Sequence, residues 1–108
     1  MKIALFIDDE RDPVNDNIHV WVIVRSSEQA IKFCEKHGVP SYISFDHDLG
    51  NDDTSMAFIH WLVEKDMDMG ESFIPHDFTF YVHSQNPIGQ RNIQQYLDRY
   101  LSFRKHDE

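Results

Sequence analysis

Residues 3–10 read Ile-Ala-Leu-Phe-Ile-Asp-Asp-Glu, and this stretch decides the fold class. Five apolar residues followed at once by three acids are typical of a central strand in a parallel sheet, because such a strand is buried on both faces. Similar short apolar runs recur further along the chain. We therefore expect four strands, near residues 3–7, 20–24, 41–46 and 78–82.

Helical signals lie between the later strands. Ser26-x-x-Gln29 has the form of a capping box, and Gly38 is placed to end the helix that this box opens. A polar loop at residues 51–54 precedes a second predicted helix. Its apolar stripe consists of Met56, Ile59, Leu62 and Val63.

The last helix has the clearest signals, with Asn86 as its N-cap and Pro87 at its first position. Strands that alternate with helices predict an α/β fold: a mainly parallel sheet of about four strands, flanked by helices. We expect strand one between strands two and three, with strands one, three and four parallel. The connection between the first two strands is short for a helical crossover, so the direction of the second strand stays open.

Length and charge narrow the function classes. The chain has 108 residues, which predicts one domain over residues 1–108, and its formal net charge is −9. That charge argues against binding to a nucleic-acid duplex or to an anionic membrane surface. The sequence has one cysteine, Cys34, and no long apolar stretch or leader pattern, so we expect a cytoplasmic protein without disulfides. The oligomeric state stays open.

Acidic residues follow two of the predicted strands directly. Asp8 and Asp9 follow the first strand, and Asp46 and Asp48 follow the third. The carboxyl ends of parallel strands meet at one edge of a sheet, where ligands bind in such folds. Clustered carboxylates repel one another unless a hard cation such as Mg²⁺ or Mn²⁺ neutralises them, so these four residues are candidate metal ligands. The alternative is that they face water or cap helices.

Histidine and phosphate-binding candidates lie at the same predicted edge. His47 and His83 each follow a strand, and histidine transfers protons near neutral pH. Ser84, Asn86 and Arg91 surround the start of the last helix, whose free N–H groups suit a phosphate. The alternative is that Asn86 only caps the helix and that Arg91 is solvated.

Other prominent side chains have structural interpretations. Arg11 follows the first acidic cluster, and contact with a phosphate and a local salt bridge explain it equally well. Trp21, Trp61, Tyr96 and Tyr100 are predicted to be core or helix-packing residues rather than a platform for stacking bases.

The order of these motifs resembles the receiver domain of response regulators. An acidic pair follows the first strand, an Asp the third and a Ser the fourth. In receivers the first acids help to hold Mg²⁺, and the later Asp, here Asp46, accepts a phosphoryl group. The sequence departs from that pattern because no fifth strand, with its Lys, follows the last helix.

The segments 5–11, 45–50 and 83–89 together resemble the cyclic-phosphate processing receiver-like domain family, which is seen in phages and bacteria. The resemblance covers about residues 3–101. It implies a flavodoxin-like, receiver-derived fold that lacks the last receiver strand. It also implies a metal-assisted enzyme acting on cyclic phosphate ends or on cyclic nucleotides.

Three functions are consistent with these features. The first is metal-assisted hydrolysis of a cyclic phosphodiester, with a small phosphate-containing ligand and with Asp46, His47 and His83 as catalytic residues. The second is a non-enzymatic receiver-like module that binds a nucleotide, a metal or a protein. The third is a phosphoacceptor domain that uses Asp46.

Overall fold

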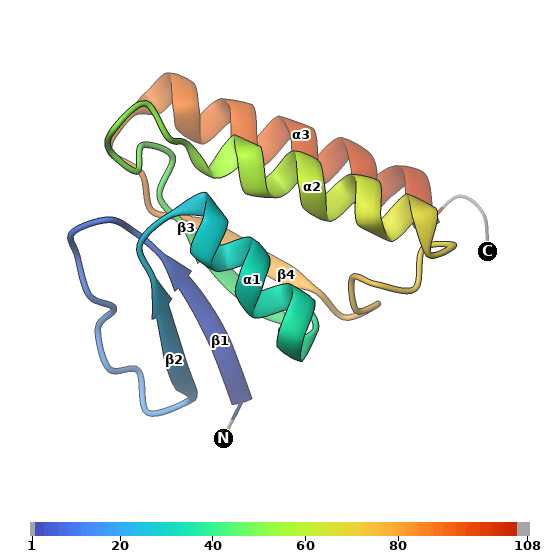
Figure 1. Ribbon diagram of the computed structural model, residues 1–108, viewed down its shortest axis with the longest axis horizontal. Helices are drawn as coiled ribbons and strands as arrows, with labels where there is room; N and C mark the ends of the chain where they lie inside the picture. Colours follow the sequence, from blue (N-terminus) through green and yellow to red (C-terminus); the bar gives the residue numbers. More distant parts are fainter. Residues whose placement is uncertain (1, 106–108) are drawn as a thin grey trace.

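The computed structural model describes residues 2–105, and its sheet has four parallel strands (Figure 1). These strands are β1 (Lys2–Ile7), β2 (His19–Val24), β3 (Tyr42–Phe45) and β4 (Thr79–Val82). Their order across the sheet is β2-β1-β3-β4. The predicted α/β class, the four strands and the place of strand one between strands two and three are confirmed.

The first two strands are parallel although no helix connects them. Residues 8–18 return along the outer side of β2 (Figure 1). An extended chain of that length spans roughly 36 Å, more than the roughly 20 Å of a six-residue strand. The Arg25 guanidinium holds this connection, because it donates to the carbonyls of Asp8 at 3.1 Å and Arg11 at 2.7 Å and to the Asp12 carboxylate at 2.6 Å.

The first and last of the three helices begin where their predicted caps place them, and the second begins directly after the polar loop at residues 51–54. The helices are α1 (Ser27–His37), α2 (Ser55–Asp68) and α3 (Pro87–Lys105). The Ser26 hydroxyl accepts the amide of Gln29 at 3.1 Å, as a capping box requires. The side-chain carbonyl of Asn86 accepts the amides of Ile88 and Gly89, both at 3.1 Å. No helix among residues 2–105 is long and apolar enough to cross a membrane.

All three helices form one layer against a single face of the sheet (Figure 1). Alternate strand residues pack with them in the core: Leu5, Ile7, Val24, Ile43, Phe45 and Val82. The strand residues between these, including Phe6, Trp21 and Tyr42, point to the opposite face. The prediction that Trp21 packs in the core or on a helix is therefore wrong. Trp61 and Tyr100 do pack in the helical layer.

A buried carboxylate joins the end of α2 to α3. Asp66 is 0% exposed and accepts the amides of Phe73 at 3.0 Å and Ile74 at 2.7 Å. The same carboxylate accepts the Tyr100 hydroxyl at 2.6 Å and Arg104 Nη1 at 3.3 Å. Its charge is thus fully compensated, which gives Asp66 a structural role.

Replacing Asp66 by alanine is expected to lower the free energy of unfolding by about 3–5 kcal/mol, because the substitution leaves Arg104 and two amides buried without a partner. Urea denaturation measures this loss. Asp68→Ala, at an exposed position of the same helix, is the matched control and is expected to change stability by less than about 0.5 kcal/mol. Equal effects of the two substitutions would contradict the assignment.

Candidate functional site

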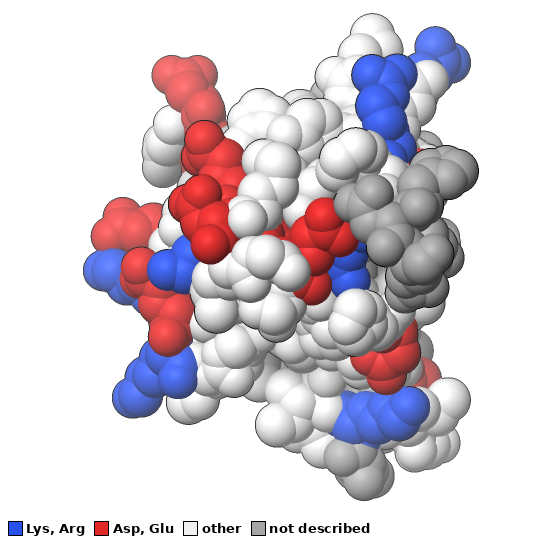
Figure 2. Space-filling model, turned by 90° about the vertical axis from the view of Figure 1, so that its right-hand side faces the viewer, with Lys and Arg blue, Asp and Glu red and all other residues white. Residues whose placement is uncertain are grey.

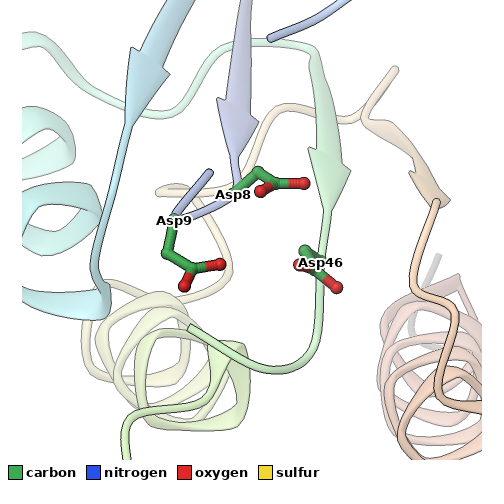
Figure 3. A group of neighbouring side chains, drawn as sticks. All are labelled: Asp8, Asp9 and Asp46. Carbon is green, nitrogen blue, oxygen red and sulfur yellow. The ribbon is translucent and has the colours of Figure 1, made fainter. Parts of the chain in front are cut away.

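Two strand ends bring three carboxylates together. Asp8 and Asp9 follow β1, and Asp46 follows the neighbouring strand β3. One ligand atom from each of the three lies within 4.8 Å of the others, and Figure 3 shows the side chains converging on a shared space. Three of the four predicted metal ligands thus meet at one edge of the sheet, whereas Asp48 is not part of this group.

An open hollow of about 470 Å³ lies at this edge. The predicted site residues that line it are Asp8, Asp9, Asp46, Asp48, Ser84 and Asn86. The structure does not place Arg91 among its lining residues, nor either of the two histidines. The guanidinium that does line it belongs to Arg11.

Acidic charge alone does not distinguish this edge from the rest of the surface. Figure 2 shows acidic groups also on the side that carries the carboxyl ends of α2 and α3, with basic groups between them. The pairing of two buried carboxylates does distinguish it, because Asp8 is 1% exposed, Asp46 is 9% exposed and the two lie in one group, whereas Asp66, buried at the end of α2, stands among donors. Removing a carboxylate from water is costly unless a partner compensates its charge, so these two residues need partners.

Asp8 has a full set of protein partners. Its Oδ1 accepts the amides of Glu10 at 2.9 Å and Arg11 at 2.8 Å. Its Oδ2 faces Arg11 Nε at 3.2 Å and His83 Nε2 at 3.0 Å. Burial by itself raises the pKa of Asp8, but these hydrogen bonds together hold the pKa below its ordinary value. Asp8 therefore stays ionised.

Asp46 lacks such a set of partners, and its pKa shifts in the opposite direction. Burial and the nearby charge of Asp8 raise its pKa above the ordinary value. Arg11 Nη2, at 3.9 Å from Asp46 Oδ2, compensates this charge only in part. With Asp9 beside them, the two buried acids form a hard, oxygen-rich set of donors. This set fits a cation such as Mg²⁺ or Mn²⁺, which prefers oxygen ligands.

His83 holds Asp8 in place. Its Nε2 contacts Asp8 Oδ2 at 3.0 Å, and its Nδ1 contacts the Ser44 hydroxyl at 2.7 Å. The ring also stacks on Phe6, with centroids 4.5 Å apart and planes within 3°. Burial lowers the pKa of His83, although the Asp8 charge opposes this shift. Because both ring nitrogens are engaged, His83 is placed to orient a candidate metal ligand.

His47 lies against the first turn of α3. A Cβ at Gly89 would come within 2.4 Å of His47 Cγ, so only glycine allows this close approach. His47 Nδ1 contacts Asp48 Oδ1 at 2.9 Å, while Asn86 donates to Asp48 Oδ2 at 3.2 Å. These two contacts lower the pKa of Asp48. Within residues 2–105, no hydrogen bond is made by His47 Nε2.

The three phosphate-binding candidates differ in their hydrogen bonds and in whether they line the hollow. The Asn86 side chain is engaged as a helix cap, and the backbone amide of Asn86 donates to the Ser84 hydroxyl at 3.1 Å. Ser84 lines the hollow beside Asp46 and lowers the pKa of that carboxyl. Arg91 is exposed on α3. The role of Arg11 is open in the sequence, although its position three residues after Asp8 is a usable signal for the ion pair between Arg11 Nε and Asp8 Oδ2 at 3.2 Å.

A parallel sheet whose carboxyl edge carries an acidic pair, a further Asp and a Ser defines a receiver-like domain. Residues 3–99 match the family model described as the Cyclic-phosphate processing Receiver domain, and the chain belongs to that family. Its described residues end with β4 and α3, without the fifth strand of receivers. No curated protein and no solved structure shows significant similarity to the chain.

Divalent metal is expected to stabilise the folded protein, because it relieves the repulsion among Asp8, Asp9 and Asp46. At free metal 100-fold above its dissociation constant, the gain is about 2.7 kcal/mol. Thermal melts with and without Mg²⁺ or Mn²⁺ measure it.

In the same melts, Asp46→Asn is expected to abolish the gain. Without metal at neutral pH this variant is expected to be more stable than the wild type, because the raised pKa of Asp46 means that its charge opposes folding. Asp52→Asn, which removes one exposed charge nearby, is expected to retain the metal response. Unchanged melts of the wild type across millimolar metal would contradict a metal site.

The Ser44 hydroxyl is expected to influence metal affinity through His83. Ser44→Ala frees the ring that orients Asp8, so we expect affinity for Mn²⁺ to fall roughly 10-fold, at the low end for residues that support a metal ligand. Titration calorimetry measures the affinity. Thr79→Ala, which removes an exposed hydroxyl from β4, is the control and is expected to leave the affinity unchanged. Wild-type affinity in the Ser44 variant would contradict this role.

Proposed function

We propose that this protein hydrolyses a cyclic phosphodiester, either a cyclic nucleotide or a 2′,3′-cyclic phosphate end, with a divalent cation held by Asp8, Asp9 and Asp46. The observation that carries the proposal is the meeting of these three carboxylates beside the Arg11 guanidinium. Membership of the cyclic-phosphate processing family supports the substrate class. When bound, such a cation polarises a phosphoryl oxygen and offsets the charge that develops on it.

Arg11 and Ser84 are the phosphate-binding groups in this proposal. Both line the hollow at the acidic edge. A guanidinium presents several N–H donors to phosphate oxygens, and the hydroxyl of Ser84 adds another donor. Arg91 was the sequence candidate for this role, and Arg11 replaces it because Arg11 lies at the hollow.

The two histidines take different roles. Each is tied to a carboxylate that lines the hollow: His83 to Asp8 and His47 to Asp48. His83 orients Asp8 through its two engaged nitrogens. We assign proton transfer to His47, which does not itself line the hollow but contacts Asp48, a residue that does, and whose Nε2 makes no hydrogen bond within the described residues.

The proton balance requires only one such imidazole. Water adds to phosphorus as the bond from phosphorus to one ribose oxygen breaks. The His47 imidazole accepts the proton that the water loses and returns it to the leaving ribose oxygen. The product is a linear phosphate monoester, and His47 ends in its starting state.

The wild-type protein is expected to convert at least one 2′,3′- or 3′,5′-cyclic nucleotide to a linear monophosphate when Mg²⁺ or Mn²⁺ is present. Chromatography of the nucleotides measures turnover. His47→Gln is expected to lower kcat by roughly 10²–10⁴-fold with metal affinity retained. His83→Gln is expected to weaken metal affinity first, so that added metal restores part of its activity.

His60→Gln, an exposed position on α2, is the control and is expected to turn over normally. Normal turnover by His47→Gln would remove His47 from the mechanism. Absence of turnover with every nucleotide and metal would contradict the proposed function. A lasting gain of one phosphoryl group in intact mass, after incubation with acetyl phosphate and Mg²⁺, would instead identify Asp46 as a phosphoacceptor.

A further inference from the structure

One face of the sheet has no helical cover among residues 2–105. Parallel sheets are normally covered on both faces, so a bare face calls for an explanation. The connection 8–18 lies at the β2 edge, away from β3 and β4 (Figure 1). The β3 and β4 half of this face is therefore the part that stays open.

The strand register places this open half directly beside the candidate site. Ser44 pairs with Phe6 on one side and with Tyr81 on the other, so these three residues form one row across the sheet. The next row towards the carboxyl edge holds Asp8, Asp46 and His83, because the strands continue in the same register. The aromatic row and the acidic site are thus neighbouring rows of one surface.

Tyr81 is the accessible ring of this row. It is 58% exposed, whereas Phe6 is 8% exposed and lies beneath the rings of His83 and Trp21. Ser44 pairs with Tyr81 and precedes Asp46 by two residues, which puts Tyr81 and Asp46 on the same face in neighbouring rows about 7 Å apart along the strands. A nucleotide sugar separates its base from its phosphate by a comparable distance.

We propose that Tyr81 stacks on the base of a nucleotide whose phosphate lies in the hollow beside Asp46 and Ser84. The inference rests on the proposed function and deepens it, because it adds a subsite for the base to a site that has so far been assigned only to the phosphate group. Aromatic rings stack on all four bases, so the subsite favours ligands that carry a base but does not distinguish one base from another. The net charge of −9 repels a long polynucleotide, which favours a mononucleotide or the last nucleotide of a short chain.

Two ligands separate the base from the phosphate in a binding test: adenosine 3′-monophosphate and inorganic phosphate, each with saturating Mg²⁺. Calorimetry on the wild type is expected to show tighter binding of the nucleotide. Tyr81→Ala is expected to reduce that preference roughly 5- to 150-fold, the range for one base on one aromatic ring. Tyr81→Phe keeps the ring and is expected to keep the preference. Tyr96→Ala, at a tyrosine 37% exposed on α3, is the control.

Equal affinity of the wild type for the two ligands, or an unchanged preference in Tyr81→Ala, would overturn the subsite. Conversion of a dimer to a monomer by Tyr81→Ala, with the preference unchanged, would assign the face to a second copy of the chain instead. Ring-proton shifts of Tyr81 in the wild type on adding the nucleotide give a readout that needs no variant, and constant shifts would also overturn the subsite. Turnover of cyclic nucleotides is measured separately. Binding that depends on Tyr81 without any turnover contradicts only the proposed hydrolysis. Turnover that does not depend on Tyr81 contradicts only the proposed subsite.

Discussion

The buried carboxylate of Asp8 is the group on which the geometry of the site depends. A charge that is 1% exposed must be compensated by partners, and those partners come from two parts of the chain. The amides of Glu10 and Arg11 fix the turn after β1, and His83 brings in the end of β4. The need to satisfy one charge thus sets the positions of the groups around the hollow.

Two other buried acids show how the surroundings decide a role. Asp66 is surrounded by donors and the Arg104 guanidinium, so its charge is compensated within the protein and it stabilises the fold. Asp46 faces the charge of Asp8 with only partial compensation from Arg11 at 3.9 Å. An aspartate side chain is therefore structural at position 66, whereas at position 46 it is a candidate ligand of a bound cation.

The sequence predicted features that depend on local pattern. The apolar run before Asp8 identified the central strand, the Asn86 cap marked the start of α3, and the strand ends located the acidic cluster. It did not predict contacts between distant strands, such as those of His83 with Ser44 and Phe6, because no local pattern encodes them.

The direction of β2 was left open, and the bare face of the sheet was not predicted, for related reasons. An extended connection carries no periodic signal, and the apolar run of β2 looks the same whether a helix covers one face or both. The misassignment of Trp21 to the core or to helix packing follows from that ambiguity.

Line broadening by Mn²⁺ in amide NMR spectra tests the central claim, a cation site made by Asp8, Asp9 and Asp46, most directly. At Mn²⁺ far below the protein concentration, the account predicts that broadening begins at residues 8–11, 46–48 and 83–85, which lie around the hollow. The acidic surface at residues 64–71 is predicted to keep sharp signals. Broadening that begins at residues 64–71, or that spreads evenly over the acidic surface, would contradict the claim.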